Sequence, residues 1–299
     1  MGCCMAEREL LVYIDGNFYP ESQAKISVYD HGLLYGDGIF EGIRAYDGRV
    51  FRLREHIDRL FESAKTIGLT IPMSKEHLSE ACAETLRRNK LSDGYLRLVV
   101  SRGVGKMGLD PRNCQKATVV IIPATYVITP APLKPIKAVV VCTRRNPPFC
   151  VPASAKTLNY LNNIMARMEA INAGADEAIM LDWRGYVCEG SGDNVFVVKN
   201  GKLLTPPLEA SILGGITRLT VLEVATKLGI GALEKDLTSH DLYNADEAFL
   251  TGTGAEVHPI IQIDGRIIGT GEEGPITKRI EDGFKKETQR PESGYPIRK

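Results

Sequence analysis

Four dipeptides of the form Asp-Gly or Asn-Gly constrain the fold of this chain more than any other feature. They occupy positions 15–16, 47–48, 200–201 and 264–265, and each lies between short apolar runs. Asp-Gly and Asn-Gly tolerate the backbone of a two-residue turn, so each pair predicts a β-hairpin. Apolar residues at helical spacing follow between the hairpins. The sequence therefore predicts a mixed α/β (α+β) fold.

Helical periodicity is clearest from residue 53 to residue 67, where apolar side chains recur every three or four positions before Pro72. A second helix is expected from Ser74, as its N-cap, to about Lys90. Further elements follow from the same patterns. They are helices over about 160–173 and 217–228, and strands over 95–101, 117–122, 138–143, 177–181 and 194–198.

The length of 299 residues suggests two domains, at roughly 150 residues per domain. Residues 128–137 contain three prolines and are predicted to be an inter-domain linker. We therefore expect a small N-terminal α/β domain over 1–127, with residues 1–8 as a disordered extension. A larger C-terminal domain is expected over 138–299, ending in a frayed tail from about 288 to 299.

The charge balance and the cysteine content restrict which kinds of molecule this protein is expected to bind. Lys and Arg total 37, as do Asp and Glu, and this zero net charge argues against a nucleic-acid-binding protein. The longest uncharged run, residues 117–133, is interrupted by three prolines and is too short to span a membrane. The seven cysteines form no CxxC pair or zinc-ligand spacing. We expect no metal, reduced thiols, a cytoplasmic location and small-molecule substrates.

A tyrosine and an arginine share one face of the strand predicted over 95–101. Side chains alternate along a strand, so Tyr95 and Arg97 lie together, opposite the apolar face that contains Leu96 and Leu98. A phenol and a guanidinium side by side can bind a carboxylate. The alternative is an arginine paired with a neighbouring glutamate on a solvated face.

Two glycine-containing loops are candidate anion sites. Gly214-Gly215 precedes the helix that includes Thr217, and a helix N-terminus offers free N–H groups to a phosphate. The second loop, residues 251–254, reads TGTG and follows a predicted strand. Helix capping without any ligand is the alternative for the first loop.

Lys156 is the only charged residue between positions 149 and 164. Desolvation in such a segment lowers the pKa of an amine and makes it nucleophilic, although most lysines are simply solvated. Glu189 stands between a predicted strand and a Gly-Ser-Gly turn. These two residues are therefore candidates for chemistry, and neither is decisive alone.

Taken together, these segments resemble the fold-type IV pyridoxal-phosphate enzymes and, among them, the branched-chain amino-acid aminotransferases. The similarity runs from about Leu10 to Lys285 through nine motifs in matching order: YIDG, YGDGIFEGIRAY, REHIDRL, YLR, RGVGKMGLDP, AKTLNYLNN, EGSGDNVF, GGITR and TGTGAEV. The resemblance implies an N-terminal two-layer α/β sandwich, a C-terminal barrel-like α/β domain and the cofactor pyridoxal 5'-phosphate.

The resemblance also implies which residues hold that cofactor. Lys156 matches the lysine that forms the internal aldimine and moves the substrate proton, and Glu189 matches the carboxylate that pairs with the pyridine nitrogen. Arg59 matches the arginine that binds the phosphate. The other implied cofactor-binding residues are Tyr160, Gly192, Leu213, Ile216, Thr217 and Thr253.

A second implied set binds substrate. Tyr95 and the amides of Gly254 and Ala255 are expected to bind the α-carboxylate, and Arg97 the distal carboxylate of 2-oxoglutarate. An apolar side-chain pocket is expected from Tyr35, Phe40, Gly42 and Tyr126.

The implied reaction is a ping-pong transfer of the amino group between leucine, isoleucine or valine and 2-oxoglutarate. The TLNYLNN spacing is also similar to that of D-amino-acid aminotransferases, so a D-amino-acid or (R)-amine aminotransferase, or an aminodeoxychorismate lyase, remains an alternative. A pyridoxal-phosphate-binding protein without turnover is a third. We expect a homodimer or larger homo-oligomer, with the loop Arg102–Gly108 near the neighbouring active site.

Overall fold

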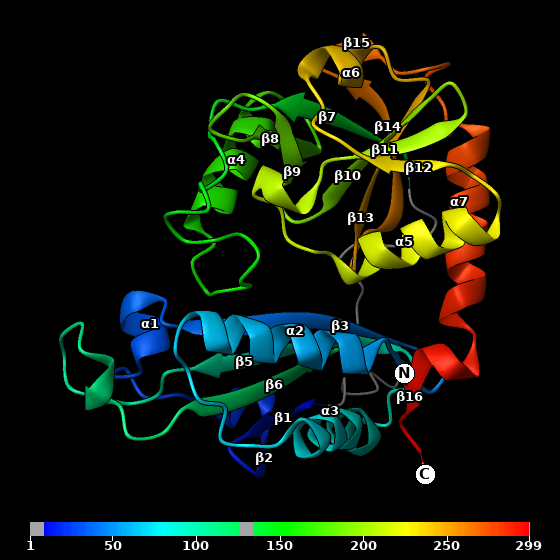
Figure 1. Ribbon diagram of the computed structural model, residues 1–299. Coiled ribbons are helices and arrows are strands. Elements are labelled where there is room, and N and C mark those ends of the chain that lie inside the picture. The colour runs from blue at the N-terminus through cyan, green and yellow to red at the C-terminus, as the bar shows by residue number, and fades with distance from the viewer. Residues whose placement is uncertain (1–8, 126–133, 299) are drawn as a thin grey trace, which may run out of the picture. The chain divides into compact units, whose positions relative to one another are not determined.

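The structure, a computed structural model, describes residues 9–125 and 134–298. It divides the chain into two compact units, one of residues 1–127 with 294–299 and one of residues 128–293 (Figure 1). The expected extension over 1–8, Tyr126 and residues 128–133 of the predicted linker lie outside the described residues. The last two residues of that linker are not linker, because strand β7 spans Ile136–Val140.

All four predicted hairpin turns are confirmed. Both residues of each dipeptide have positive φ, the conformation that a two-residue hairpin turn requires. The turns connect β1 (Leu11–Ile14) to β2 (Asn17–Pro20), β3 (Gly38–Tyr46) to β4 (Arg49–Phe51), β10 (Asn194–Lys199) to β11 (Lys202–Thr205), and β14 (Glu256–Ile263) to β15 (Arg266–Ile267).

The first unit is a two-layer α/β sandwich, as expected. Its seven-stranded sheet has the order β16-β4-β3-β5-β6-β1-β2, with every neighbouring pair antiparallel. Helices α2 and α3 cover the sheet, and their apolar residues form one core with Ile39, Ile43, Leu96 and Leu98 (Figure 1). The remaining elements of this unit are α1 (His31–Tyr35), α2 (Leu53–Thr66), α3 (Lys75–Asn89), β5 (Gly94–Ser101), β6 (Thr118–Ala124), β16 (Gly294–Pro296) and the short 3-10 helices Glu21–Gln23 and Pro111–Asn113.

Both predicted ends of the helix expected from Ser74 to about Lys90 are confirmed. The predicted N-cap Ser74 accepts a hydrogen bond at its side chain from the N–H of His77, at 3.2 Å. Helix α3 then ends where Lys90 adopts a left-handed conformation with φ of 58°.

A closed ring of strands forms the second unit. Its order β10-β13-β14-β7-β8-β9 returns to β10 through the pairing of Asn194 with Glu189, so six strands make a barrel. This confirms the barrel-like domain. The remaining elements are α4 (Leu161–Asn172), β8 (Glu177–Leu181), β9 (Val187–Gly190), the 3-10 helix Leu208–Ala210, α5 (Ile216–Lys227), β12 (Ala232–Glu234), α6 (Ser239–Tyr243), β13 (Glu247–Gly252), α7 (Pro275–Thr288) and the 3-10 helix Pro291–Ser293.

The prediction of a frayed C-terminal tail over 288–299 is wrong. Strand β16 pairs with β4, and the Ile297 side chain is 3% exposed in the core of the first unit. The Arg87 Nε donates to the carbonyl oxygen of Ile297 at 2.8 Å. Burial of Ile297 and strand pairing hold residues 294–298 in place, and residues 294–299 belong to the first unit rather than to the C-terminal domain.

No helix within residues 9–125 and 134–298 is long and apolar enough to cross a membrane.

Candidate functional site

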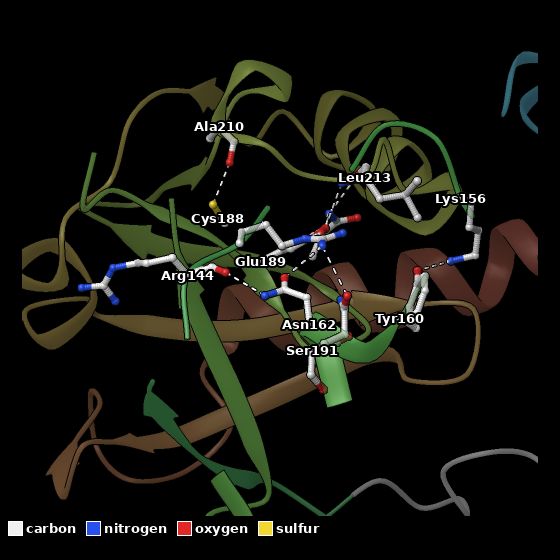
Figure 2. Close-up of polar contacts among 12 residues, drawn as sticks. Arg144, Lys156, Tyr160, Asn162, Cys188, Glu189, Ser191, Ala210 and Leu213 are labelled. Atoms are coloured by element: carbon white, nitrogen blue, oxygen red, sulfur yellow. Dashed lines mark hydrogen bonds and ion pairs between the residues drawn. The ribbon is translucent and has the colours of Figure 1, made fainter. Parts of the chain in front are cut away.

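Lys156 lies in the loop before α4, and its Nζ donates a hydrogen bond to the Tyr160 Oη at 3.1 Å (Figure 2). Both side chains are half-buried. Tyr160 is the residue that caps the N-terminus of α4, so the start of the helix fixes its position. The structure thus brings together two of the residues predicted to bind the cofactor.

The Glu189 carboxylate, near the end of β9, is 5% exposed and firmly held. Its Oε1 accepts from the Arg145 Nε at 2.8 Å, and its Oε2 accepts from the Asn194 Nδ2 at 3.1 Å and the Leu213 N–H at 3.0 Å (Figure 2). A carboxylate has about four acceptor positions. The hydrogen bonds of the described residues fill three, which leaves one on Oε1 for a further donor such as a protonated ring nitrogen.

Arg145 and Asn194 are functional candidates that the sequence reasoning missed. The Arg145 side chain is buried and holds Glu189 from a loop 44 residues earlier in the sequence. Asn194 donates through the same Nδ2 to Glu189 and, at 2.9 Å, to the carbonyl oxygen of Leu213. The signal for Asn194 was its place in EGSGDN, directly across the turn from Glu189.

The N-terminus of α5 has the features of an anion site. Its N-cap is Gly215, so no side chain caps it, and no hydrogen bond to the N–H of Ile216 or Thr217 is found in the described part of the chain. A Cβ at Gly215 would lie 2.0 Å from the Asn194 Oδ1, which explains the glycine. Free N–H groups and the helix dipole together favour a phosphate here.

The TGTG segment, residues 251–254, begins in the last two residues of β13 and continues into the turn after it, so the predicted loop starts two residues later than expected. Strand β13 pairs with β10 so that Thr251 lies opposite Asn194. Asn194 in turn pairs with Glu189, so the loop and the Glu189 carboxylate lie at the same end of the barrel. The Thr251 hydroxyl is buried and has no hydrogen-bond partner among the described residues. Thr253 and Gly254 are half-buried and Ala255 is buried.

Pyridoxal phosphate fits the groups at this end of the barrel. The spare acceptor of Glu189 suits its ring nitrogen, the free N–H groups of α5 suit its phosphate, and Lys156 supplies an amine. Leu213 contacts the Glu189 carboxylate through its backbone, whereas Gly192 is exposed in the turn between β9 and β10.

Arg59, on α2 of the first unit, forms a buried double ion pair with Glu41 of β3. The Arg59 Nε and Nη2 donate to the two Glu41 oxygens, both at 2.7 Å, and the His56 Nδ1 lies 2.8 Å from Glu41 Oε2. Burial alone would raise the pKa of Glu41, but the adjacent Arg59 and His56 outweigh it and lower that pKa to about 2. Glu41 and His56 were missed, although a glutamate between buried Ile39 and Ile43 was a signal.

The predicted substrate residues Phe40, Gly42, Tyr95 and Arg97 share one face of the first sheet. Gly42 lies directly opposite Arg97, whose guanidinium carbon is 4.6 Å from the Phe40 ring centre and 5.7 Å from that of Tyr95. A Cβ at Gly42 would lie 2.2 Å from the Tyr95 Oη. Arg97 has no ion pair within residues 9–125 and 134–298, so the alternative of an arginine paired with a surface glutamate is not supported.

Tyr35, the last residue of α1, binds the loop Arg102–Gly108, because its Oη accepts from the N–H of Gly108 at 2.8 Å. Its side chain is 38% exposed. The candidate residues therefore fall into two sets. Arg59, Tyr35, Phe40, Gly42, Tyr95 and Arg97 lie in the first unit, and the others of the described chain lie in the second.

Known proteins resemble this chain over almost its full length. The amino-transferase class IV family matches residues 38–263. A putative branched-chain-amino-acid aminotransferase of Methanocaldococcus jannaschii is 53% identical over 280 residues, covering 92% of this chain and 95% of that protein. The solved structure of the Thermoproteus uzoniensis branched-chain aminotransferase with norvaline has a TM-score of 0.92 at 43% identity, covering 97% of this chain and 100% of that one.

A further solved structure is that of the T.th. branched-chain amino acid aminotransferase complexed with N-(5'-phosphopyridoxyl)-L-glutamate. It is 38% identical, with a TM-score of 0.92, and covers 97% of this chain and 99% of that one. The family match spans most of the described barrel and includes Lys156, Glu189 and the N-terminus of α5. The chain therefore belongs to the amino-transferase class IV family.

Proposed function

We propose that this protein is a pyridoxal-phosphate-dependent aminotransferase that moves the amino group between L-branched-chain amino acids and 2-oxoglutarate by a ping-pong mechanism. Family membership and the branched-chain aminotransferases among its relatives support the reaction and the substrate class. The observation that carries the proposal is the buried Glu189 carboxylate, held by three donors with one acceptor position spare, in the same unit as Lys156.

Lys156 and Glu189 have different tasks in this proposal. When bound, pyridoxal phosphate supplies an electron sink for the carbanion that remains after the α-proton of the substrate is removed. The Lys156 amine binds the cofactor and carries that proton, and the Tyr160 hydroxyl holds the amine at 3.1 Å. An ionised Glu189 keeps the ring nitrogen protonated, because a nearby negative charge stabilises the cation.

The phosphate is assigned to the free N–H groups of Ile216 and Thr217. The Thr217 and Thr253 side chains and Gly192 are proposed as further cofactor-binding groups. Arg59 is the proposed cation for the phosphate. Its guanidinium is oriented by the double hydrogen bond to Glu41, which leaves its direction little freedom. Anion binding at such a helix N-terminus needs no side-chain cap.

Substrate recognition is assigned to the face that carries Arg97. A guanidinium packed on the Phe40 and Tyr95 rings can stay there beside an apolar substrate and turn to meet the distal carboxylate of glutamate. Tyr95 and the amides of Gly254 and Ala255 are the proposed α-carboxylate ligands, with Tyr35, Gly42 and Tyr126 as further pocket residues. Tyr126 lies outside the described residues.

We also propose that the protein acts as a homodimer or larger oligomer in the cytoplasm. The loop Arg102–Gly108 is the part expected to reach the neighbouring active site. Within and just after it, Val104, Met107 and Leu109 are 51%, 73% and 84% exposed, as expected of apolar side chains that a partner covers. A D-amino-acid aminotransferase is not favoured, because the relatives are named for branched-chain substrates.

Covalent capture of the cofactor tests the enzyme assignment. The purified protein is mixed with pyridoxal phosphate, reduced with borohydride and digested, and peptides are analysed by mass spectrometry. We expect a yellow protein with the cofactor on Lys156, no covalent adduct in Lys156→Ala, and a normal adduct in the exposed control Lys202→Ala. A wild-type protein that stays colourless would contradict the proposal.

A further inference from the structure

Arg145 carries a buried positive charge whose contacts extend beyond the Glu189 carboxylate. The residue lies in the loop between β7 and α4 and is 5% exposed. Its backbone N–H donates to the carbonyl oxygen of Leu181, the last residue of β8, at 2.9 Å. A guanidinium does not lose its proton in proteins, so Glu189 keeps a cationic partner at any pH at which the protein works.

The same guanidinium contacts the first turn of α4 through a second nitrogen atom. Its Nε donates to the Glu189 Oε1 at 2.8 Å. Its Nη1 donates to the Asn163 Oδ1 at 3.3 Å and to the Asn162 Oδ1 at 3.4 Å. Arg145 therefore joins the carboxylate that is proposed for the ring nitrogen to the helix that begins directly after Tyr160.

The two asparagine side chains are oriented so that their oxygens face Arg145. The Asn163 Nδ2 donates to the carbonyl oxygen of Ser191 at 2.8 Å. The Asn162 Nδ2 donates to the carbonyl oxygen of Arg144 at 2.9 Å (Figure 2). An amide whose NH2 group is bound in this way presents its oxygen to another donor. The guanidinium is thus held on the asparagine side as well as on the carboxylate side.

This arrangement determines which acceptor position of Glu189 stays free. The Asn194 Nδ2 and the Leu213 N–H both donate to Oε2, and Arg145 occupies one position on Oε1. The direction of the Arg145 bond therefore sets the direction of the position that is left on Oε1. An ionised carboxylate only accepts hydrogen bonds, and a neighbouring guanidinium favours that ionised form.

We propose that Arg145 is a positioning residue that keeps Glu189 ionised and directs its free Oε1 position at the ring nitrogen of pyridoxal phosphate, so that the proton between them stays on the ring. This inference rests on the proposed function. Without Arg145 the buried Glu189 has no cationic partner, and a buried carboxylate in that state is stabilised by taking up a proton. The proton then moves from the ring nitrogen to Glu189, and the neutral ring is a weaker electron sink.

NMR of the ring nitrogen tests this proposal without catalysis. The wild type and its variants are loaded with pyridoxal phosphate that carries ¹⁵N in the ring, because the chemical shift of that nitrogen distinguishes a protonated from a neutral ring. We expect a protonated ring in wild type, a neutral ring in Arg145→Met, and a protonated ring in Arg145→Lys, which restores the charge. Arg184→Met is the matched control and should give the wild-type shift, because the Arg184 Nε also donates to a carboxylate at 2.8 Å, that of Asp182.

The affinity of the apo-protein for pyridoxal phosphate separates the charge of Arg145 from its geometry. A lysine ammonium lacks the planar fork that contacts Glu189 and the asparagines together. We therefore expect Arg145→Lys to raise the Kd for pyridoxal phosphate about tenfold, and Arg145→Met to raise it further, to about a hundredfold. Arg184→Met should leave the Kd unchanged.

Three results would overturn the inference: a neutral ring in wild type, a protonated ring in Arg145→Met, or a wild-type Kd in Arg145→Lys. Failure of the proposed function is distinguishable, because wild type would then not react with L-leucine even though its ring nitrogen still responds to Arg145→Met. If Arg145→Met does not fold, the Kd of Arg145→Lys decides.

Discussion

Replacing Glu41 by glutamine removes the charge that holds Arg59 in place. The carboxylate is fully buried, and Arg59 and His56 lower its pKa from 4.5 to about 2. At neutral pH this difference corresponds to about 3 kcal/mol of folding stability, similar to the roughly 3–5 kcal/mol lost when a buried pair is broken. Because the folded-state pKa lies below the ordinary value, the stabilisation is complete above pH 4.5 and declines as the pH falls towards 2.

Urea unfolding monitored by circular dichroism measures this loss. Glu41→Gln should lower the free energy of unfolding by about 3 kcal/mol at pH 7, and the difference from wild type should narrow below about pH 4.5. The matched control is Glu84→Gln, whose carboxylate pairs with Arg87 and Arg88 on the surface of α3. The side chains of this solvent-accessible network are 30–52% exposed, and such a pair contributes about 1 kcal/mol or less. Equal effects of the two substitutions would refute the reasoning.

Three further changes test the substrate face and the tail. Gly42→Ala places a Cβ 2.2 Å from the Tyr95 Oη, so the phenol must move. We therefore expect KM for amino acids to rise about tenfold, while the affinity for the cofactor stays unchanged. Deleting the residues after Ser293 removes β16 and the buried Ile297. This should lower the free energy of unfolding by at least about 2 kcal/mol. An unchanged free energy of unfolding would instead indicate a frayed tail. Arg97→Gln should slow the half-reaction with glutamate far more than the one with leucine, and equal losses in stopped-flow kinetics would contradict its assignment.

Elements governed by local chemistry were predictable from the sequence. The Asn200-Gly201 turn, for example, needs two residues with positive φ, and the observed values are 50° and 74°. The Ser74 N-cap follows from the same kind of local hydrogen bond. Both features depend on residues within four positions of each other, so no tertiary information is required.

The partners of buried charges could not be predicted in this way. Glu41 and Arg59 are 18 residues apart, and Arg145 and Glu189 are 44 apart, so only the packing of helix on sheet and the closure of the barrel bring them together. A single sequence indicates that Glu41 lies on a buried face of its strand, but it does not indicate which cationic side chain forms an ion pair with it.

The C-terminal tail was mispredicted because its residues are typical of a loop. Gly294 and Pro296 are residues that usually interrupt a strand. Strand β16 is an edge strand, however, and proline is tolerated there. The apolar Ile297 was the overlooked signal, since its side chain joins a core formed mostly by residues before position 125.

The most direct test of the proposed function compares half-reactions of the holoenzyme with single amino acids. L-leucine and D-alanine are mixed separately with the protein in a stopped-flow spectrometer, and the absorbance of the Lys156-bound cofactor is followed. We predict rapid loss of that absorbance with L-leucine and its recovery on addition of 2-oxoglutarate. Faster loss with D-alanine than with L-leucine would contradict the assignment to L-branched-chain amino acids.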